Sequence, residues 1–388
     1  MKPTKMNILL ICKSLPWRFK GGIQTHTWNL ALALTEKGHS VTVLTGGAYR
    51  EGEKQYEIDG VGIIEIPFFP GRYLKPISNL AEEFSFNWQA KNWVKKNHSC
   101  FNVIHTQGRS GYLLYMIPAL KGRLANTIHG IISRESSSEK GWSFNSKLHA
   151  WLTQKIEYKL LKAAQLKIAV SKDVCEEISL SNHLEGVEVI PNGVKLSTVE
   201  AITNKQVLAG DKTKFLFVGR LHPVKGLAPV ITAIAKTKSK IQLDIVGNGP
   251  QYKTLKDLIK KHKLESQITL LGEYSNAQIH EAIPSYRALL LPSSYETQGI
   301  VLLEANAHGV PVVATDLAAI RESVTHGENG LLCNIEQPES YVFAMEYLLE
   351  NPAEAEGMGA IGKERISSVF TWDKVAERTI ESYQKLAV

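Results

Sequence analysis

The sequence predicts an α/β protein built from two domains in tandem, each a doubly wound parallel sheet. At 388 residues the chain is roughly twice as long as a typical domain. Short apolar runs alternate with helical patterns, and this alternation breaks off near residue 195 and then starts again. Strand–helix–strand units of this kind form parallel sheets with right-handed crossovers. We therefore expect one domain over residues 1–195 and a second over residues 196–371.

The first domain opens with such a unit. Residues 7–12 form a short apolar run typical of a buried strand, residues 23–37 have helical periodicity that Gly38 ends, and residues 40–45 form the next strand. The same reasoning predicts further strands at 61–66, 103–106, 126–129, 166–170 and 187–190.

The second domain follows a polar, aperiodic segment, residues 195–213, which we interpret as the linker. Ser275 and Gln278 have the spacing of a helix capping box. We expect strands at 214–218, 241–246, 268–271, 288–291 and 310–314, and helices at 227–236, 250–262, 275–283 and 299–308.

Composition excludes several classes of protein. With 44% hydrophobic and 21% charged residues, the chain is neither disordered nor fibrous. No apolar run reaches the ~18–20 residues that span a bilayer, and the opening segment lacks the features of a signal peptide. The four cysteines have neither disulfide nor metal spacing. We expect a cytoplasmic protein without a cofactor or a metal site.

Charge is unevenly distributed along the chain. Residues 1–196 carry a net charge of +9, and the remainder carries −2. Two stretches, residues 84–96 and 142–167, mix aromatic residues with lysines, as helices that lie on anionic membrane surfaces do. The alternative is that the tryptophans pack on the sheet and the lysines are merely solvated.

Two glycine-containing loops are candidates for phosphate binding. Gly21 and Gly22 end a loop that leads from a strand into a helix, where free backbone N–H groups attract anions. Arg220 and Lys225 lie in one strand-to-helix loop of the second domain, and two cations at a helix N-terminus suit a diphosphate. Ordinary turn chemistry and solvated surface cations are the alternatives.

Two carboxylates and one histidine are further candidates. Glu296 precedes a helix and Glu304 lies within it, so the pair could contact two parts of an extended ligand that carries hydroxyl groups. A capping acid and a salt-bridged helix residue are the alternatives. His129 ends a strand of the first domain, at the edge where doubly wound sheets bind ligands, although a lone histidine is more often structural.

Motifs of other enzyme classes are missing from the sequence. There is no P-loop, no Gly-x-Gly-x-x-Gly after the first strand, no Gly-x-Ser-x-Gly and no His-Glu-x-x-His. The motifs that are present resemble, in order and spacing, those of the retaining glycosyltransferases of family 4, also called group 1 glycosyltransferases. The resemblance rests on Gly21-Gly22, His129-Gly130, Pro191-Asn192-Gly193-Val194, Gly219-Arg220, Lys225-Gly226, Gly247-Asn248-Gly249-Pro250, Leu291-Pro292-Ser293, Glu296, Gly299, Glu304-Ala305, the segment 309–314 and the segment 327–330.

The resemblance implies a GT-B fold, in which two Rossmann-like domains face a cleft. The first domain would bind the acceptor and the second the nucleotide sugar, and a final helix, residues 372–388, would pack back on the first. By similarity, Arg220 and Lys225 bind the diphosphate, Glu304 the ribose, and Glu296 the donor sugar. The residues that the resemblance implies to be catalytic are His129, near the reacting carbon, Glu296, Arg220 and Lys225. The other donor-binding positions so implied are Gly22 at the phosphates, Gly299 and Ile300 at the helix start, and Gly272 and Tyr274 near the base.

The implied activity is retaining, metal-independent transfer of a hexose from a nucleoside diphosphate sugar, with UDP preferred and GDP as the other option. The acceptor would be lipid-linked or a glycan, in polysaccharide or glycolipid synthesis, and no nucleic-acid partner is expected. The basic first domain and its two aromatic stretches, rather than the resemblance, predict a protein peripheral at the inner membrane face with a lipid-linked acceptor. Without membrane association, a soluble sugar or small molecule is the expected acceptor. The alternatives are a GT-B nucleotide-sugar epimerase and a catalytically silent module that binds nucleotide sugar.

Overall fold

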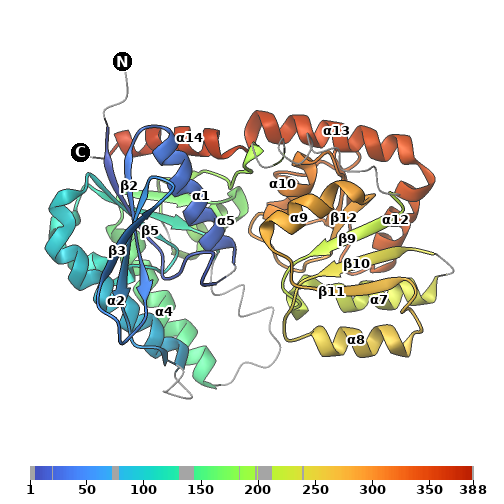
Figure 1. Ribbon diagram of the computed structural model, residues 1–388, viewed down its shortest axis with the longest axis horizontal. Coiled ribbons are helices and arrows are strands. Elements are labelled where there is room, and N and C mark those ends of the chain that lie inside the picture. The colour runs from blue at the N-terminus through green and yellow to red at the C-terminus, as the bar shows by residue number, and fades with distance from the viewer. Residues whose placement is uncertain are drawn as a thin grey trace. The chain divides into compact units, whose positions relative to one another are not determined.

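The computed structural model of the chain (Figure 1) describes residues 5–19, 21–71, 78–130, 144–182, 184–196, 199, 212–237 and 240–386. The chain divides into two compact units: Met1–Asn192 with Trp372–Val388, which we call domain 1, and Gly193–Thr371, which we call domain 2. The division lies close to the expected boundary after residue 195. Most of the linker expected at 195–213 lies outside the described residues.

Domain 1 contains an eight-stranded sheet in the order β3-β4-β2-β1-β5-β6-β7-β8. All neighbouring strands pair in parallel except β3 and β4, which are antiparallel. The strands are β1 (Asn7–Ile11), β2 (Ser40–Gly47), β3 (Lys54–Ile58), β4 (Val61–Pro67), β5 (Val103–Gln107), β6 (Leu124–Ile128), β7 (Leu166–Ala169) and β8 (Val187–Val189).

Helices cover both faces of this sheet, because successive residues of a strand point to opposite sides. In β1, Ile8 and Leu10 belong to the core beneath α1 and α14, while Leu9 and Ile11 belong to the core beneath α2, η3 and α4. The helical segments are α1 (Gly22–Glu36), α2 (Ser78–Asn97), η2 (His98–Cys100), η3 (Tyr112–Met116), η4 (Pro118–Leu120), α4 (Phe144–Ala163), α5 (Lys172–Asn182) and α14 (Trp372–Gln384).

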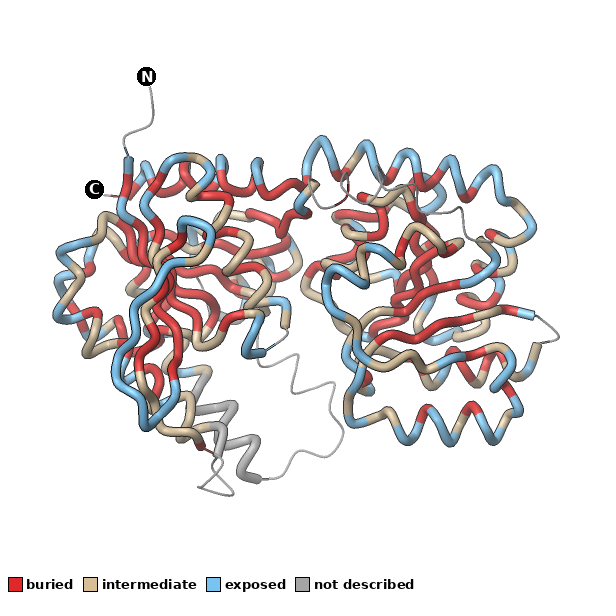
Figure 2. Tube along the Cα trace, viewed as in Figure 1, coloured by how far each residue is buried: buried red, intermediate tan, exposed pale blue. Residues whose placement is uncertain are grey.

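The strand β3 was not predicted. Its first four residues are exposed, as Figure 2 shows along the edge of the domain 1 sheet, so the alternation of apolar and polar residues that reveals a half-buried strand is missing. It lies antiparallel at the sheet edge after a turn through Asp59 and Gly60, both with positive φ. The rest of the sheet is parallel, as predicted.

Domain 2 contains a six-stranded, wholly parallel sheet in the order β11-β10-β9-β12-β13-β14. Its strands are β9 (Lys214–Val218), β10 (Gln242–Val246), β11 (Ile268–Gly272), β12 (Ala288–Leu291), β13 (Val312–Thr315) and β14 (Gly330–Cys333). Its helical segments are η5 (Pro223–Lys225), α7 (Leu227–Lys236), α8 (Tyr252–Lys261), α9 (Asn276–Ala282), η6 (Ile283–Ser285), α10 (Ile300–Ala307), α11 (Ala318–Arg321), α12 (Glu339–Glu350) and α13 (Pro352–Val369).

Two layers of helices enclose the domain 2 sheet. The helices α7 and α8 lie on one side of it, and α9 and α10 lie on the other (Figure 1). The helix α7 coincides with the predicted residues 227–236, and α9 begins with the predicted capping box. The hydroxyl of Ser275 accepts from the backbone N–H of Gln278 at 3.3 Å, and the Gln278 carbonyl accepts from the backbone N–H of Ser275 at 2.8 Å. The sequence pattern therefore predicted the strands and α-helices from β9 to β13 to within two residues, but it did not predict α11, β14, α12 or α13.

Candidate functional site

The loop between β9 and α7 carries two predicted site residues, Arg220 and Lys225. Pro223 starts a single 3₁₀ turn, η5, and Gly226 follows it with φ +66°, which a side chain would disfavour. A Cβ atom on Gly226 would also lie 1.9 Å from the carbonyl oxygen of Pro292. The loop after β9 therefore presses against the loop after β12, and only glycine fits at the contact.

Side chains hold these two loops together. The ammonium group of Lys225 lies 2.5 Å from Glu296 Oε1, and the hydroxyl of Ser293 donates to the same oxygen at 2.8 Å. The backbone N–H of Ser294 donates to the carbonyl of Val224 at 2.8 Å. Both charged side chains are largely buried, with exposed fractions of 23% for Lys225 and 12% for Glu296. Two residues predicted independently are thus brought into direct contact.

Arg220 lies in the same loop as Lys225, and its side chain is exposed. Its position depends on the loop after β10, because Gly247 approaches so closely that a Cβ atom would lie 1.9 Å from the carbonyl oxygen of Gly219. The backbone N–H of Leu221 donates to Asn248 at 2.9 Å. Three loops at the carboxyl ends of β9, β10 and β12 therefore build one edge of the sheet.

The helix α10 starts at this edge. Gly299 occupies the N-cap position with φ +73°, and no side chain caps the helix there. The first backbone N–H groups, beginning with that of the half-buried Ile300, therefore have no capping side chain. Such a helix start carries partial positive charge and suits an anionic ligand.

Glu304 lies in the middle of α10, and its side chain is 19% exposed. Burial raises the pKa of this carboxyl to about 7. His280 of α9 lies beside it, with its Nε2 at 3.8 Å from Glu304 Oε1, and burial lowers the pKa of this histidine. Glu304 therefore differs from Glu296 in its environment, because no lysine or arginine among the described residues forms an ion pair with it.

The two positions predicted near a nucleotide base, Gly272 and Tyr274, lie in the loop after β11. Gly272 has φ +74°, and its carbonyl accepts from the backbone N–H of Gly247 at 2.7 Å. The ring of Tyr274 packs partly against the domain 2 core. This loop therefore adjoins the loop after β10 at the same end of the sheet.

In domain 1, His129 directly follows β6 and is half-buried. Its Nε2 lies 2.9 Å from the side-chain oxygen of Gln107, so the ring and this amide share a hydrogen bond. Burial, with smaller contributions from His26 and His105, holds the pKa of His129 well below its ordinary value. The ring is therefore neutral at neutral pH and can serve as a hydrogen-bonding group, not as a cation.

Gly22, the other domain 1 position, is the first residue of α1 and is exposed. Gly21 is the N-cap in extended conformation, and no side chain caps this helix either. As predicted, the glycine pair ends the loop after β1 and opens a helix.

Sequence reasoning missed His26. Its ring packs edge-on against His129 at 4.6 Å and against Trp372 at 5.3 Å, and its Nδ1 lies 2.6 Å from Asn192 Oδ1. Burial lowers the pKa of His26 to about 4. Asn192 belongs to the motif 191–194, which the sequence analysis had noted. Nothing in the sequence indicated that this motif contacts a histidine in α1.

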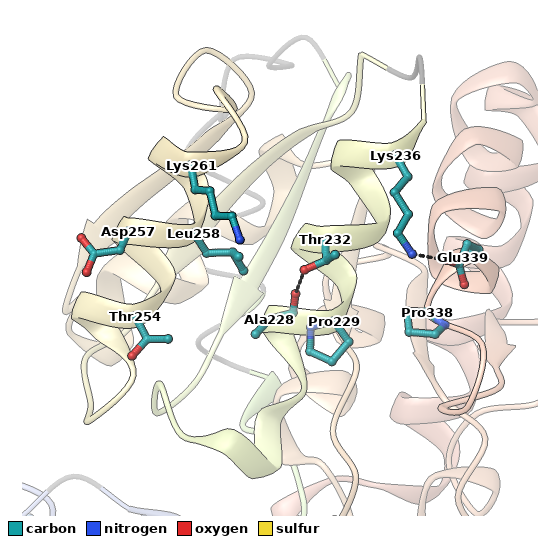
Figure 3. A pocket seen from close by; sticks show the side chains of 10 residues that line it. All are labelled: Ala228, Pro229, Thr232, Lys236, Thr254, Asp257, Leu258, Lys261, Pro338 and Glu339. Atoms are coloured by element: carbon teal, nitrogen blue, oxygen red, sulfur yellow. Dashed lines mark hydrogen bonds and ion pairs between the residues drawn. The ribbon is translucent and has the colours of Figure 1, made fainter.

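A groove of about 550 Å³ lies elsewhere on domain 2, between α7 and α8 (Figure 3). It is lined by Ala228, Pro229, Thr232, Lys236, Thr254, Asp257, Leu258, Lys261, Pro338 and Glu339. The groove contains none of the predicted site residues. Among the described residues, no group of three or more His, Cys, Asp or Glu side chains is arranged to hold a metal ion.

Comparison with known protein families accounts for nearly the whole chain. The family described as Glycosyltransferase Family 4 matches residues 20–198, and that described as Glycosyl transferases group 1 matches residues 198–365. The chain belongs to the group 1 glycosyltransferases. The resemblance drawn from its motifs is confirmed.

Relatives of this glycosyltransferase match it from end to end. A phosphatidyl-myo-inositol mannosyltransferase of Mycobacterium tuberculosis is 26% identical, over 98% of this chain and 97% of the relative. Two solved structures show the same GT-B fold. They are sucrose-phosphate synthase from Thermosynechococcus elongatus (22% identity, TM-score 0.83, 98% of this chain and 99% of that one) and Anabaena HepE in complex with UDP-glucose (19%, 0.74, 98% and 100%).

The glycosyltransferase has, among its described residues, no helix long and apolar enough to cross a membrane. The two α/β domains and the class of enzyme, a glycosyltransferase, agree with the expectations from the sequence.

Proposed function

We propose that this glycosyltransferase transfers a hexose from a nucleoside diphosphate sugar, with UDP preferred over GDP, and that it retains the configuration at the transferred carbon without a metal ion. Domain 2 would bind the donor, and domain 1 would bind the acceptor. The observation that carries the proposal is the pairing of Lys225 with Glu296 beside the uncapped start of α10. A cation, a carboxylate and a helix N-terminus meet there at the carboxyl ends of parallel strands, where such sheets bind nucleotides.

Each residue then has a role that its environment supports. Arg220 and Lys225 neutralise the diphosphate as it leaves, and fixed cations that follow a growing negative charge lower the barrier. Glu296 accepts hydrogen bonds from the donor sugar, and Glu304 from the ribose. The backbone N–H groups after Gly299, starting at Ile300, add partial positive charge near the phosphates.

The remaining donor contacts are proposed as follows. His129, kept neutral by burial, offers hydrogen bonds to the sugar near the reacting carbon, and Gly22 leaves room for phosphate at the start of α1. Gly272 and Tyr274 contact the base. Among the solved structures that resemble this chain, HepE is in complex with UDP-glucose, which supports UDP as the first nucleotide to test.

Transfer is tested by incubating the protein with UDP- and GDP-sugars and candidate acceptors, with and without EDTA. We expect release of free nucleotide, a new glycoside whose anomeric configuration by NMR equals that of the donor, and no loss of rate with EDTA. An inverted product would disprove retention, and a donor that is only epimerised or only bound would replace the transferase proposal.

The acceptor we propose is lipid-linked, and we propose that domain 1 meets it at an anionic membrane surface, on the inner face of the membrane. On α2, Phe84 and Trp88 are 48% and 45% exposed and their rings stack at 5.9 Å, while Lys91 Nζ lies 3.7 Å above the Trp88 ring. This exposed strip of aromatic and cationic groups suits a lipid headgroup boundary. Trp93 differs, because it is turned toward Phe101 and donates to Glu53.

A second aromatic and basic stretch was predicted at residues 142–167. Trp142 and the side chains of Phe144 and Trp151 lie outside the described residues, so the proposal rests on α2. One relative is a phosphatidyl-myo-inositol mannosyltransferase by name, which supports a lipid acceptor as the class to test.

Membrane binding is tested by sedimentation with vesicles of phosphatidylcholine alone or with one third phosphatidylserine, at low and high salt. We expect binding that requires the anionic lipid and weakens with salt. The double variant Phe84→Ser/Trp88→Ser should lose it. The control variant Phe343→Ser removes an aromatic ring that is 64% exposed on α12 of domain 2 and should bind as before. Equal binding by all three proteins would refute the role of α2.

A further inference from the structure

Two histidines lie near Glu304 in domain 2, and neither has a role in the function proposed above. His280 comes from α9, and His308 directly follows the last residue of α10. His280 Nδ1 and His308 Nε2 are 2.9 Å apart, and His280 Nε2 lies 3.8 Å from Glu304 Oε1. The three side chains thus form a chain of polar contacts that ends at the carboxylate proposed to bind ribose.

We propose that His280 is a positioning residue, which turns an N–H group toward the Glu304 carboxylate, and that His308 fixes the tautomer in which it does so. The inference rests on the proposed function, in which the carboxylate of Glu304 accepts hydrogen bonds from a nucleotide's ribose hydroxyls.

The contact between the two rings can form in two ways, because one nitrogen must donate and the other accept. If His308 donates from Nε2, the proton of His280 lies on Nε2 and faces the carboxylate, and His308 Nδ1 is a bare acceptor. If His280 donates from Nδ1, its lone pair faces Glu304, and the proton of His308 lies on Nδ1.

The surroundings of His308 favour the first arrangement. Its Nδ1 is buried and has no hydrogen-bond partner among the described residues. A buried N–H donor without a partner is rarer and more unfavourable than a buried acceptor without one. The proton of His308 therefore belongs on Nε2, and that choice directs the N–H of His280 toward Glu304.

The charges around the three groups are consistent with neutral histidines. Burial lowers the pKa of His280, and burial together with His280 and Lys363 of α13 lowers the pKa of His308 to about 4. The pair thus acts on Glu304 through an oriented N–H dipole. The pKa of Glu304 is raised to about 7 by burial, so any group that favours the ionised form changes how much carboxylate is present at neutral pH.

The consequence concerns nucleotide affinity. Ribose hydroxyls donate to the ionised carboxylate better than to the protonated acid, so UDP affinity should fall as pH drops through about 7. The N–H of His280 favours the ionised form and shifts this midpoint to lower pH. Without it, the midpoint should rise by about one pH unit, which is about tenfold in ionisation.

The test is UDP binding by calorimetry from pH 5.5 to 8.5. His280→Phe should raise the Kd about fivefold at pH 7 and about tenfold at pH 5.5, and it should move the midpoint upward. His280→Gln, whose amide N–H reaches the position of the imidazole Nε2, should restore most of the affinity and the midpoint. His262→Phe, at the end of α8, is the matched control and should behave as wild type. An unchanged midpoint in His280→Phe, or a Gln variant as weak as the Phe variant, would overturn the proposal.

A second measurement separates this inference from the proposed function. Nitrogen-15 NMR of the wild-type protein without ligand should find both histidines neutral at pH 7 with their protons on Nε2. The opposite tautomers in a protein that binds UDP would overturn the positioning role alone. A wild-type protein that binds none of UDP, GDP and ADP would overturn the proposed function, and the role of His280 in it.

Discussion

Ionised Glu304 is expected to bind ribose, but the same buried charge destabilises the fold. Its pKa is raised from the ordinary 4.5 to about 7 by burial. Below pH 4.5 both folded and unfolded states hold the proton. Between pH 4.5 and 7 only the unfolded chain releases it, so the free energy of unfolding falls as pH rises. Above pH 7 the folded protein carries a buried charge, and the full penalty, about 3 kcal/mol, is present.

We therefore expect Glu304→Gln to stabilise domain 2 by up to about 3 kcal/mol at pH 8 and by little at pH 5. Urea unfolding at the two pH values measures this, and UDP binding should weaken in the same variant. Glu281→Gln alters an exposed carboxylate on α9 and should change neither. A variant that is equally or less stable at pH 8 would contradict the assigned burial.

Gly226 tests the contact between the two site loops. Alanine there would combine a strained positive φ with a Cβ atom 1.9 Å from the Pro292 carbonyl oxygen, so one loop must move. We expect a loss of more than about 3 kcal/mol in domain 2 stability and weaker UDP binding. Gly327 also has positive φ, +81°, but open space around it, so Gly327→Ala should lose only the ~1–2 kcal/mol of backbone strain. Similar losses in both variants would show that the close approach is unimportant.

The sequence predicted most of the site's residue types but not their partners. Lys225 and Glu296 stood out because each occupies a loop at a strand end. Their contact joins positions 71 residues apart, and it exists because β12 pairs directly with β9. His280 could not be predicted, since its importance comes only from the packing of α9 beside α10. The roles assigned to individual residues came from family resemblance and stay predictions.

At the scale of elements, the loop after β9 places two cations in different settings. Lys225 is held by Glu296, whereas the side chain of Arg220 is exposed. If both bind one diphosphate, Arg220→Ala and Lys225→Ala should each lower kcat/KM about 10- to 100-fold, and the double variant should lose less than the product.

Steady-state kinetics with a saturating acceptor measures these effects, and thermal unfolding checks that the fold persists. Lys236→Ala, which removes an exposed ammonium group at the end of α7, is the control and should leave kcat/KM unchanged. Fully multiplicative losses in the double variant would mean that the two cations act on separate groups.

Several elements with strong periodicity were predicted well, although α12 was not, and the exposed or very short elements were missed. Residues of β9 and α7 are apolar at the positions that face the core, so their bounds followed from the pattern. The edge strand β3 is exposed at four of its five residues, and η3 is too short to have a helical period. Local sequence has no period to reveal such segments, since only their place in the fold makes them regular.

At the scale of the whole molecule, domain 1 is assembled from both ends of the described chain. Side chains of α14 and of the turn after it, among them Trp372, Ile380, Tyr383 and Leu386, belong to the same buried core as Leu30 and Leu34 of α1. The hydroxyl of Tyr383 also lies 2.6 Å from Nδ1 of the buried His105. The restart of the α/β pattern predicted two domains. The apolar period of α14 alone does not say which sheet it covers.

We expect a chain that ends at Thr371 to lose the cooperative unfolding of domain 1 while domain 2 keeps its stability. Hydrogen exchange should show lost protection in β1 and β2 and unchanged protection in β9 and β12. A chain that ends at Gln384 keeps α14 and should retain most of the protection in domain 1. Undiminished protection of β1 in the shorter chain would show that α14 is dispensable.

The late position of α14 also sets an order of events during synthesis. Residues 193–371, all of domain 2, are translated before the helix that completes domain 1. At the usual 5–20 residues per second, roughly 10 to 40 seconds separate residue 192 from residue 372. During that interval the apolar side of α1 is not yet covered by α14. We expect a nascent-chain chaperone to bind this exposed apolar surface. The first domain to be made is therefore the last to be finished.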